Sequence, residues 1–405
     1  MNNNQNTAAK IHEVGEEYQR FNQKNHVIMQ TLWNEELKDI DAERNKILKE
    51  HVQSGKQGYN RFDYAFHHGA MNFIDKIGFG INVPDQSANS WDNFVCSIPY
   101  EGAFEDPVET TKVVKKAAMM YGADAVGITK LDRRWVYSEW YDPEKKESFP
   151  IRFSDENSAY HQITKPVLMA DGTRVLPKAM DTVIVLMFEM NYDRLRYAPT
   201  LLAYGETSKV YTDMCKVSMN VAGFINALGF NALPSINCTA LNVPLAIDAG
   251  LGQIGRHGKV ISPTLGSRTR VAKIITDMPL LPDEPIDFGV TEFCDTCKKC
   301  ARECPSNAIS NGKRAKEAVD ETGNSHYLRW IIDHKRCYKY WAECGTNCNI
   351  CLYVCPYNRG YRWTRNVLDL TDDRNTNSNN MIDSLEDIYS LDGLSARSHK
   401  YWKKE

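Results

Sequence analysis

The residues of this sequence most able to do chemistry are its cysteines, and eight of the twelve fall into two runs. The first run has the spacing C-x2-C-x2-C-x3-C-P, and the second has C-x3-C-x2-C-x3-C-P. The runs consist of Cys294, Cys297, Cys300 and Cys304, and of Cys344, Cys348, Cys351 and Cys355. In such runs three closely spaced thiolates hold one iron-sulfur cubane, while the fourth cysteine, next to proline, reaches across to the other cubane. The spacing therefore predicts two [4Fe-4S] clusters.

The crossed rule also predicts which thiolates share a cluster. The first cluster takes Cys294, Cys297, Cys300 and Cys355, and the second takes Cys304, Cys344, Cys348 and Cys351. The second run has three residues between Cys344 and Cys348, where two are usual, so Cys337 competes with Cys344 as the cluster ligand. Keeping all eight thiolates in one pattern favours Cys344. A zinc pair or disulfides are the alternatives, but zinc sites use C-x2-C pairs separated by a spacer.

Length, composition and charge limit the remaining possibilities. The 405 residues allow two or three domains, and 42% hydrophobic residues are ample for a sizeable core. A net charge of -3 provides no broad basic field and disfavours a nucleic-acid partner. No stretch approaches the roughly 20 apolar residues of a spanning helix, and the first residues lack both a signal-peptide core and a twin-arginine motif. We expect either a cytoplasmic protein or a processed form.

Periodicity predicts the elements that position the cysteines. Apolar residues in the first fifty positions recur at intervals of three, four or seven, which predicts long helical segments, and an aromatic-rich stretch to residue 100 reads as a cover. A helix is predicted over 109–121, strands over 125–128 and 182–188, and a helix over 208–228. The predicted units are 1–100, a helical and aromatic cover; 101–128 and 181–288, an α/β core; 129–180, an excursion; 289–360, the cluster domain; and 361–405, a tail.

Three polar residues of the core face inward or follow strands. Tyr211 shares one face of the predicted helix with Met214 and Cys215, so it points into the core. Asn237 follows a short strand, and Arg270 opens the alternating strand RVAKIIT. Each has an ordinary interpretation as a buried hydrogen-bonding residue.

A glycine-rich loop also stands out, because Gly250, Gly252 and Gly255 match the G-x-G-x-x-G dinucleotide fingerprint as a string. The fingerprint must follow a strand and open a helix, but here a strand-like KVI and Ser262-Pro263 follow it. Two interpretations remain open: close backbone approach to a large ligand, or a plain tight loop.

Together the cysteine runs, the loop GLGQIGRHGKVISPTLGSRTR and the core with its inward tyrosine resemble the corrinoid-dependent reductive dehalogenases, over residues 101 to 360. The resemblance implies an α+β fold: a nitroreductase-like corrinoid-binding core with an inserted two-[4Fe-4S] ferredoxin-like domain and a helical N-terminal unit. It implies base-off cobalamin, reduced to Co(I) through both clusters. The chain lacks the Asp-x-His-x-x-Gly signature by which other B12 proteins supply histidine to cobalt.

The resemblance also implies roles for individual residues. Tyr211 is similar to the family's proton donor, Arg270 to the basic residue beside it, and Asn237 to a polar residue of the pocket. A phenol is a weak acid, but a nearby guanidinium favours its ionised form and so eases proton release. Gly250, Gly252 and Gly255 would approach the corrinoid. Trp341 resembles an aromatic wall of the substrate pocket, with packing over a cluster as the alternative.

The implied function is reductive dehalogenation of a small organohalide, a chlorinated alkane or alkene, and the length favours the branch acting on chlorinated methanes and ethanes. The alternatives are epoxyqueuosine reductase acting on tRNA, which the tyrosine and the acidic charge disfavour, and a non-enzymatic electron carrier, which leaves the core unexplained. The family is exported by a twin-arginine signal, so we expect the chain at the extracytoplasmic face of the membrane. Expected partners are a small membrane-anchor protein, an upstream electron donor and a second copy of the chain.

Overall fold

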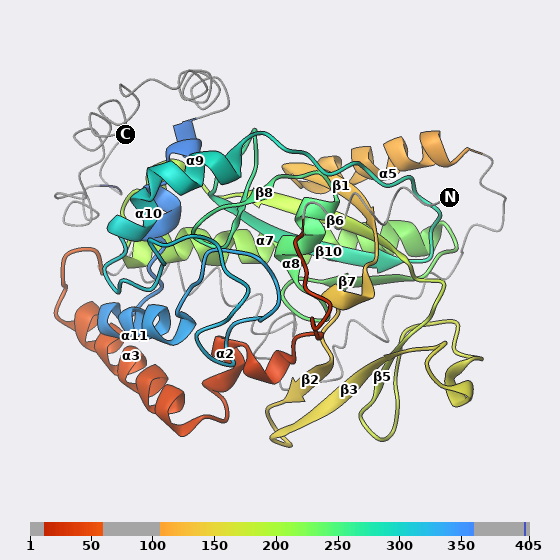
Figure 1. The fold of residues 1–405 in the computed structure, drawn as a ribbon, viewed down its shortest axis with the longest axis horizontal. Helices are drawn as coiled ribbons and strands as arrows, with labels where there is room; N and C mark the ends of the chain where they lie inside the picture. Colours follow the sequence, from red (N-terminus) through yellow and green to blue (C-terminus); the bar gives the residue numbers. More distant parts are fainter. Residues whose placement is uncertain (1–11, 60–105, 360–400, 402–405) are drawn as a thin grey trace.

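The computed structural model describes residues 12–59, 106–359 and 401 (Figure 1). Its central sheet has the order β1-β6-β10-β7, and every neighbouring pair is antiparallel. These strands are β1 (Ala125–Lys130), β6 (Thr182–Glu189), β10 (Thr269–Thr276) and β7 (Ala232–Ser235). Seven of the eight residues of β6 are buried, as expected for a strand covered on both faces. The predicted strands over 125–128 and 182–188 are confirmed.

Helices cover both faces of this sheet. On one face lie α5 (Pro107–Tyr121) and α7 (Leu201–Ala227), packed on Ile184, Leu186 and Phe188 of β6. On the other lies α8 (Asn242–Asp248), packed on the alternate residues Val183, Val185 and Met187. The predicted helix over 109–121 is confirmed. The helix predicted from Ser208 begins at Leu201, because burial of the LLAYGET segment extends it past Gly205.

A second sheet forms within residues 129–180 (Figure 1). Its order is β2-β3-β5-β4, with β2 (Glu139–Asp142), β3 (Glu147–Phe153), β5 (Arg174–Leu176) and β4 (Val167–Leu168). Short 3-10 turns, η3 (Arg133–Trp135) and η4 (Ser158–Tyr160), flank β2 and β3. Trp135, Trp140 and Phe153 are buried with the α8 side of the core. The stretch without clear period is therefore a packed layer on the core.

The N-terminal segment is only partly helical. It contains η1 (Gln23–Asn25), α2 (Val27–Gln30) and the long α3 (Glu35–Gln53), whereas residues 12–22 form no helix. The prediction of helix through Val14, Tyr18 and Phe21 is wrong, because these side chains pack one by one on the core from a chain that pairs with Tyr327. The remaining cover and the tail fall outside the described residues, apart from residue 401.

The cluster domain contains short helices joined by irregular chain. They are α9 (Val290–Cys297), α10 (Lys299–Arg302), α11 (His334–Cys344), α12 (Ile350–Tyr353) and η5 (Pro356–Arg359). The core contributes α6 (Tyr192–Leu195) and the hairpin of β8 (Gln253–Ile254) and β9 (Val260–Ile261). In Figure 1, α11 lies beside α3, and the two helices are in contact.

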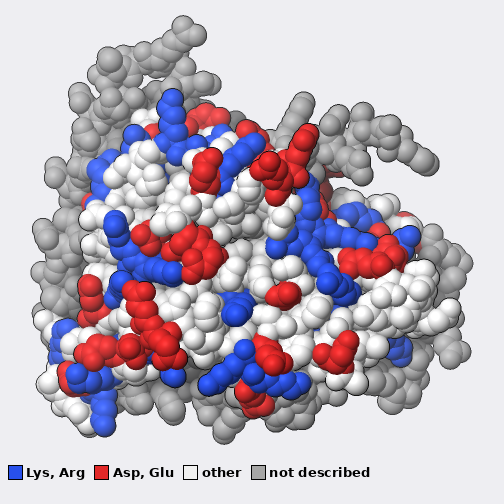
Figure 2. All heavy atoms as spheres, turned by 60° about the horizontal axis from the view of Figure 1, so that its bottom comes forward, with Lys and Arg blue, Asp and Glu red and all other residues white. Residues whose placement is uncertain are grey.

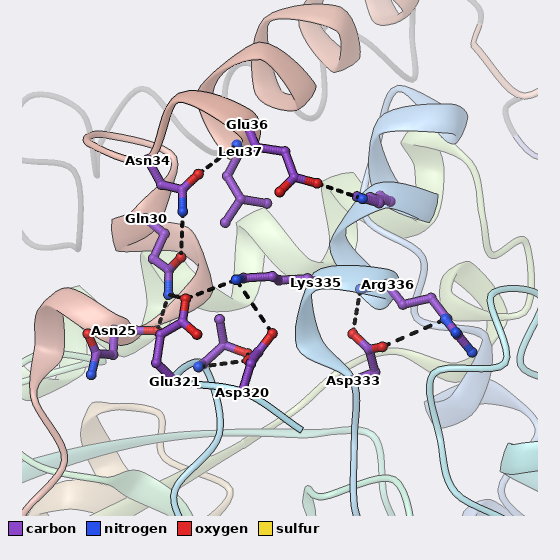
Figure 3. Close-up of polar contacts among 12 residues, drawn as sticks. Asn25, Gln30, Asn34, Glu36, Leu37, Asp320, Glu321, Asp333, Lys335 and Arg336 are labelled. Carbon is purple, nitrogen blue, oxygen red and sulfur yellow. Dashed lines mark hydrogen bonds and ion pairs between the residues drawn. The ribbon is translucent and has the colours of Figure 1, made fainter. Parts of the chain in front are cut away.

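Polar contacts fasten α11 to the N-terminal helices (Figure 3). Lys335 pairs with Glu321 at 2.9 Å and with Asp320 at 3.5 Å, and Lys339 pairs with Glu36 at 2.7 Å. Gln30 joins the network through Glu321 at 3.5 Å. The helix that follows the first cysteine run is therefore held between the core and the N-terminal segment.

The surface carries charges of both signs. On the face shown in Figure 2, basic and acidic side chains are interspersed. Some of the charges of the molecule form ion pairs, such as Arg133 with Asp155 and Arg134 with Asp132. Within the described segments, no helix combines the length and apolar character needed to cross a membrane.

Candidate active site

The first group of cysteines surrounds a cavity. Cys294 and Cys297 come from α9, Cys300 comes from α10, and Cys355 follows α12; all four line this cavity. Burial raises the pKa of the Cys355 thiol to about 12, and it raises the pKa of Cys300 strongly, with Cys294 and Cys355 adding to the shift. The structure thus brings together the four residues expected to share one cluster, three from one run and one from the other. The donor set fits a [4Fe-4S] cluster.

The second group differs from expectation in one member. Burial, reinforced by the neighbouring thiols of Cys351 and Cys304, raises the pKa of Cys337 to about 12. Cys348 interacts with Cys351, then with Cys337, and less with Cys344. Burial raises the pKa of Cys344, but the groups that act most on its thiol are Tyr340, Glu343 and Lys56, and its interaction with Cys348 is weaker than that of Cys337. The structure therefore favours Cys337 over Cys344 beside Cys304, Cys348 and Cys351.

The two candidate cysteines occupy similar positions on one helix, which is why the sequence did not distinguish them. Cys337 and Cys344 are both on α11 and seven positions apart, two turns of the helix, so spacing alone does not separate them. Cys344 is the last residue of α11, and its carbonyl accepts a hydrogen bond from the Tyr59 hydroxyl.

Within the described residues, no three His, Cys, Asp or Glu side chains are arranged to hold a single metal ion.

The glycine loop packs against its own chain. A Cβ on Gly250 would lie 2.5 Å from the Glu284 carbonyl oxygen, and one on Gly252 would lie 2.1 Å from that of Ile261. A Cβ on Gly255 would meet the Ile261 side chain at 2.6 Å. The loop follows α8 and enters the β8-β9 hairpin, so it is not a dinucleotide fingerprint. The glycines therefore allow close packing of the loop against its own chain, and their approach to a corrinoid stays a prediction.

The same loop supports the first cluster cavity through Arg256, which the sequence analysis did not single out. Its side chain is 1% exposed and lines the cavity. The guanidinium donates to the carbonyl oxygens of Cys294 at 3.0 Å, Ser310 at 2.7 Å and Gly312 at 2.9 Å. A buried cation beside the thiols favours their anionic form and holds the run in place.

Tyr211, Asn237 and Arg270 meet on the α7 side of the sheet. Asn237 donates from Nδ2 to the Tyr211 hydroxyl at 3.0 Å, and the Arg270 guanidinium carbon lies 5.8 Å from the centre of the tyrosine ring. Tyr211 is only partly buried, and Nε of Arg270 is buried without a hydrogen-bond partner in the described structure. A partly buried phenol beside a guanidinium with an N–H that has no partner is suited to giving a proton to a bound molecule.

Asn349 connects this site to the cluster domain and was missed by sequence reasoning. Arg270 donates to Oδ1 of Asn349 at 3.1 Å, while Nδ2 of Asn349 donates to Thr207 of α7 at 2.9 Å. Asn349 has φ of 60° and follows Cys348 directly. Asparagine adopts this left-handed conformation more readily than most residues, but two of the partners of Asn349, Arg270 and Thr207, lie far away in sequence. The tyrosine site therefore lies beside the second group of cysteines.

Trp341 lies on α11. Its ring packs against Tyr338 on the same helix at 5.7 Å, and Tyr338 in turn bonds to Asp41 of α3. These contacts show Trp341 packed against its own helix, and its place in a substrate pocket stays a prediction.

The comparisons with known proteins agree with this geometry. Residues 293–358 match the family described as 4Fe-4S double cluster binding domain. The overall fold is that of a reductive dehalogenase: the solved structure of the catabolic reductive dehalogenase NpRdhA, in complex with 3-bromo-4-hydroxybenzoic acid, matches with a TM-score of 0.64 at 21% identity. That match covers 95% of this chain and 48% of the other.

Among curated proteins, the chain is 42% identical over 266 residues to the tetrachloroethene reductive dehalogenase of Sulfurospirillum multivorans, covering 64% of this chain and 52% of that protein. It is 36% identical over 300 residues to that of Desulfitobacterium hafniense, covering 69% and 54%. The chain is a relative of the reductive dehalogenases, which confirms the resemblance. It spans about half the length of the curated relatives it matches.

Proposed function

We propose that this chain carries the catalytic centre of a reductive dehalogenase that replaces a halogen of a small chlorinated alkene with hydrogen. The observation that carries the proposal is the meeting of Tyr211, Asn237 and Arg270 beside the second group of cysteines. The names of the relatives favour an alkene such as tetrachloroethene over the methanes and ethanes expected from length.

Eight thiolates would hold the two [4Fe-4S] clusters. We assign Cys294, Cys297, Cys300 and Cys355 to the first and Cys304, Cys337, Cys348 and Cys351 to the second. Electrons would pass from the first cluster to the second and on to the tyrosine site, because Arg270 influences Cys351 and bonds to the residue after Cys348.

A base-off corrinoid, held by a nitroreductase-like core, would supply a strongly reducing cobalt next to the substrate. The protein's own residues would deliver the proton. Tyr211 accepts a hydrogen bond from Asn237, so its own O–H is free to point at the substrate carbon. Arg270 would stabilise the negative charge that develops on the phenol oxygen as the proton leaves.

An epoxyqueuosine reductase acting on tRNA is the second candidate. It would require a surface that attracts phosphates, whereas charges of both signs alternate on the face in Figure 2. The tyrosine with its arginine also favours the dehalogenase. A non-enzymatic electron carrier leaves the paired Tyr211 and Arg270 without a role.

The expected location and partners follow from the same proposal. The chain would act at the extracytoplasmic face of the membrane, next to a small membrane-anchor protein and an upstream electron donor, and could form a homo-oligomer. Fractionation of cells that produce the protein tests the location: recovery in the cytoplasm would contradict it.

The decisive experiment is Tyr211→Phe, assayed for release of chloride from tetrachloroethene with a reduced viologen donor. This change keeps the ring and deletes the transferable hydrogen, so the fold and both clusters should persist while turnover falls by about 10² to 10⁴. Arg270→Met should affect the same step, so the double variant should lose much less than the two single losses combined.

The matched control is Tyr121→Phe, at the exposed end of α5, which should retain full activity. Metal analysis after anaerobic purification should give about one cobalt and eight irons per chain in every variant. Turnover by Tyr211→Phe near that of the control, with this metal content, would show that the proton comes from elsewhere.

A further inference from the structure

A lysine is completely buried on the sheet face opposite Tyr211. Lys273 of β10 is 0% exposed, and its neighbours Val271 and Ile275 on that face belong to the α8 side of the core. Its Nζ donates to the carbonyl oxygen of Ile236 at 3.1 Å and to Oδ1 of Asn242 at 2.8 Å. Lysine is almost never fully buried unless it is paired with a carboxylate, and both of these partners are neutral. A lysine in this position needs an explanation beyond packing.

Asn242 continues the hydrogen bonds away from the lysine. Its Nδ2 donates to Oδ1 of Asn237 at 3.2 Å, and also to the carbonyl oxygens of Ile236 at 2.7 Å and Val271 at 2.9 Å. Asn242 is the first residue of α8, so a helix and two segments of the sheet fix its position. Asn237 then donates from its own Nδ2 to the Tyr211 hydroxyl at 3.0 Å.

The chemistry of the donors gives this chain one direction. Both partners of Lys273 are oxygens, so the amine donates to each whether or not it carries its charge. The oxygen of Asn242 must therefore face Lys273, which turns its NH₂ towards Asn237. The same constraint turns the NH₂ of Asn237 towards Tyr211. Every hydrogen bond from Lys273 to the tyrosine is donated in the same sense.

We propose that Lys273 and Asn242 are positioning residues for Tyr211, which act through Asn237 to keep the phenol oxygen an acceptor and its proton directed at the substrate. The proposal rests on the function proposed above for Tyr211. Chains of hydrogen bonds with one direction polarise one another, so the bond to the phenol oxygen strengthens as that oxygen becomes negative. Neither residue touches the substrate.

The first test reports on the tyrosine without requiring turnover. 3-Fluorotyrosine is placed at position 211 of the holoenzyme, and its ¹⁹F resonance is compared in Lys273→Met and Asn242→Asp. The first variant removes the terminal donor; the second keeps an acceptor for Lys273 but removes the NH₂ that faces Asn237. Both should shift the resonance in the same direction. Ile275→Val, on the same face of β10, is the control and should leave the resonance unchanged.

The second test separates positioning from loss of structure. Each variant should lower kcat about tenfold, the order of one lost hydrogen bond, and leave KM unchanged. In a Tyr211→Phe background, neither variant should lower kcat further. Thermal unfolding and iron content identify any variant that fails to fold; in that case the other variant decides.

The two tests distinguish the possible failures. If no form of the protein dehalogenates, the proposed function fails, but the fluorine shift still decides whether Lys273 positions Tyr211. If both variants match Ile275→Val in the ¹⁹F spectrum, the positioning proposal is overturned, whatever the activity.

Discussion

The two cysteine groups of the cluster domain are built differently. The first is formed by α9, α10 and the residue before η5, and a buried arginine, Arg256, bonds to the backbone around it. The second takes Cys337 from α11, a helix held in place by α3 and by ion pairs with the loop at Asp320 (Figure 3). The first group therefore takes its ligands from the two cysteine runs alone, whereas the second also depends on how a separate helix is docked.

The cations beside the two cysteine groups differ in how deeply they are buried. Arg256 is 1% exposed, whereas Lys259, three residues later in the same loop, is exposed and influences the thiols of Cys337 and Cys351. A buried charge is weakly screened, and an exposed one is strongly screened. We therefore expect the loop to tune the first group strongly and the second weakly.

The largest expected effect comes from breaking the crossed ligands. Cys355→Ser should damage the first cluster and Cys304→Ser the second, each removing about half of the iron. Cluster-resolved EPR of the reduced proteins measures which signal is lost. Loss in Cys355→Ser of the signal assigned to Cys348 and Cys351 would show that the ligands do not cross.

The next test sharpens the choice on α11. Cys337→Ala should lose the second cluster, since its thiol lies beside those of Cys304 and Cys351. Cys344→Ala is the matched control on the same helix and should retain its full iron content. Iron analysis together with EPR decides between them, and the reverse result would restore the assignment made from the cysteine spacing.

Particular elements and residues show how much of the fold and of the site the sequence could predict. β6, α5 and the crossed first group follow from local patterns: an apolar run, a capped amphipathic stretch and fixed cysteine spacing. Lys273 and Asn349 could not be found in this way, because the hydrogen bonds that link them to the site join residues more than 30 positions apart and each looks ordinary in its own segment. The helix prediction for residues 12–22 failed for a related reason. Apolar residues that pack singly on a core can recur at the intervals expected of a helix.

A smaller effect is expected from Arg256→Met, which leaves three carbonyl oxygens of the cluster domain without their donor. Unsatisfied buried acceptors should lower the free energy of unfolding by roughly 2–4 kcal/mol. The change also removes a positive charge beside the first cavity. The reduction potential of the first cluster should therefore fall, while that of the second should change little. Thermal unfolding and a redox titration measure the two effects.

Arg336→Met, on the exposed side of α11, is the control for losing an arginine. If Arg256→Met unfolds at the same temperature as this control and both clusters keep their potentials, the buried cation does not distinguish the two groups.

The smallest expected effect comes from Lys259→Met. An exposed charge contributes about 0.2–1 kcal/mol, which corresponds to roughly 10–40 mV for a one-electron couple. Reduction adds a negative charge to the cluster, so removing the lysine should lower the potential of the second cluster and leave the first nearly unchanged. Since an exposed charge is screened by ions, the shift should shrink from low to high salt, and Lys259→Arg, which keeps the charge, should show little shift. Two results would contradict this: equal shifts in the reduction potentials of both clusters, or a shift that does not change with salt. Either would mean that the loop does not act on the two groups through separate cations.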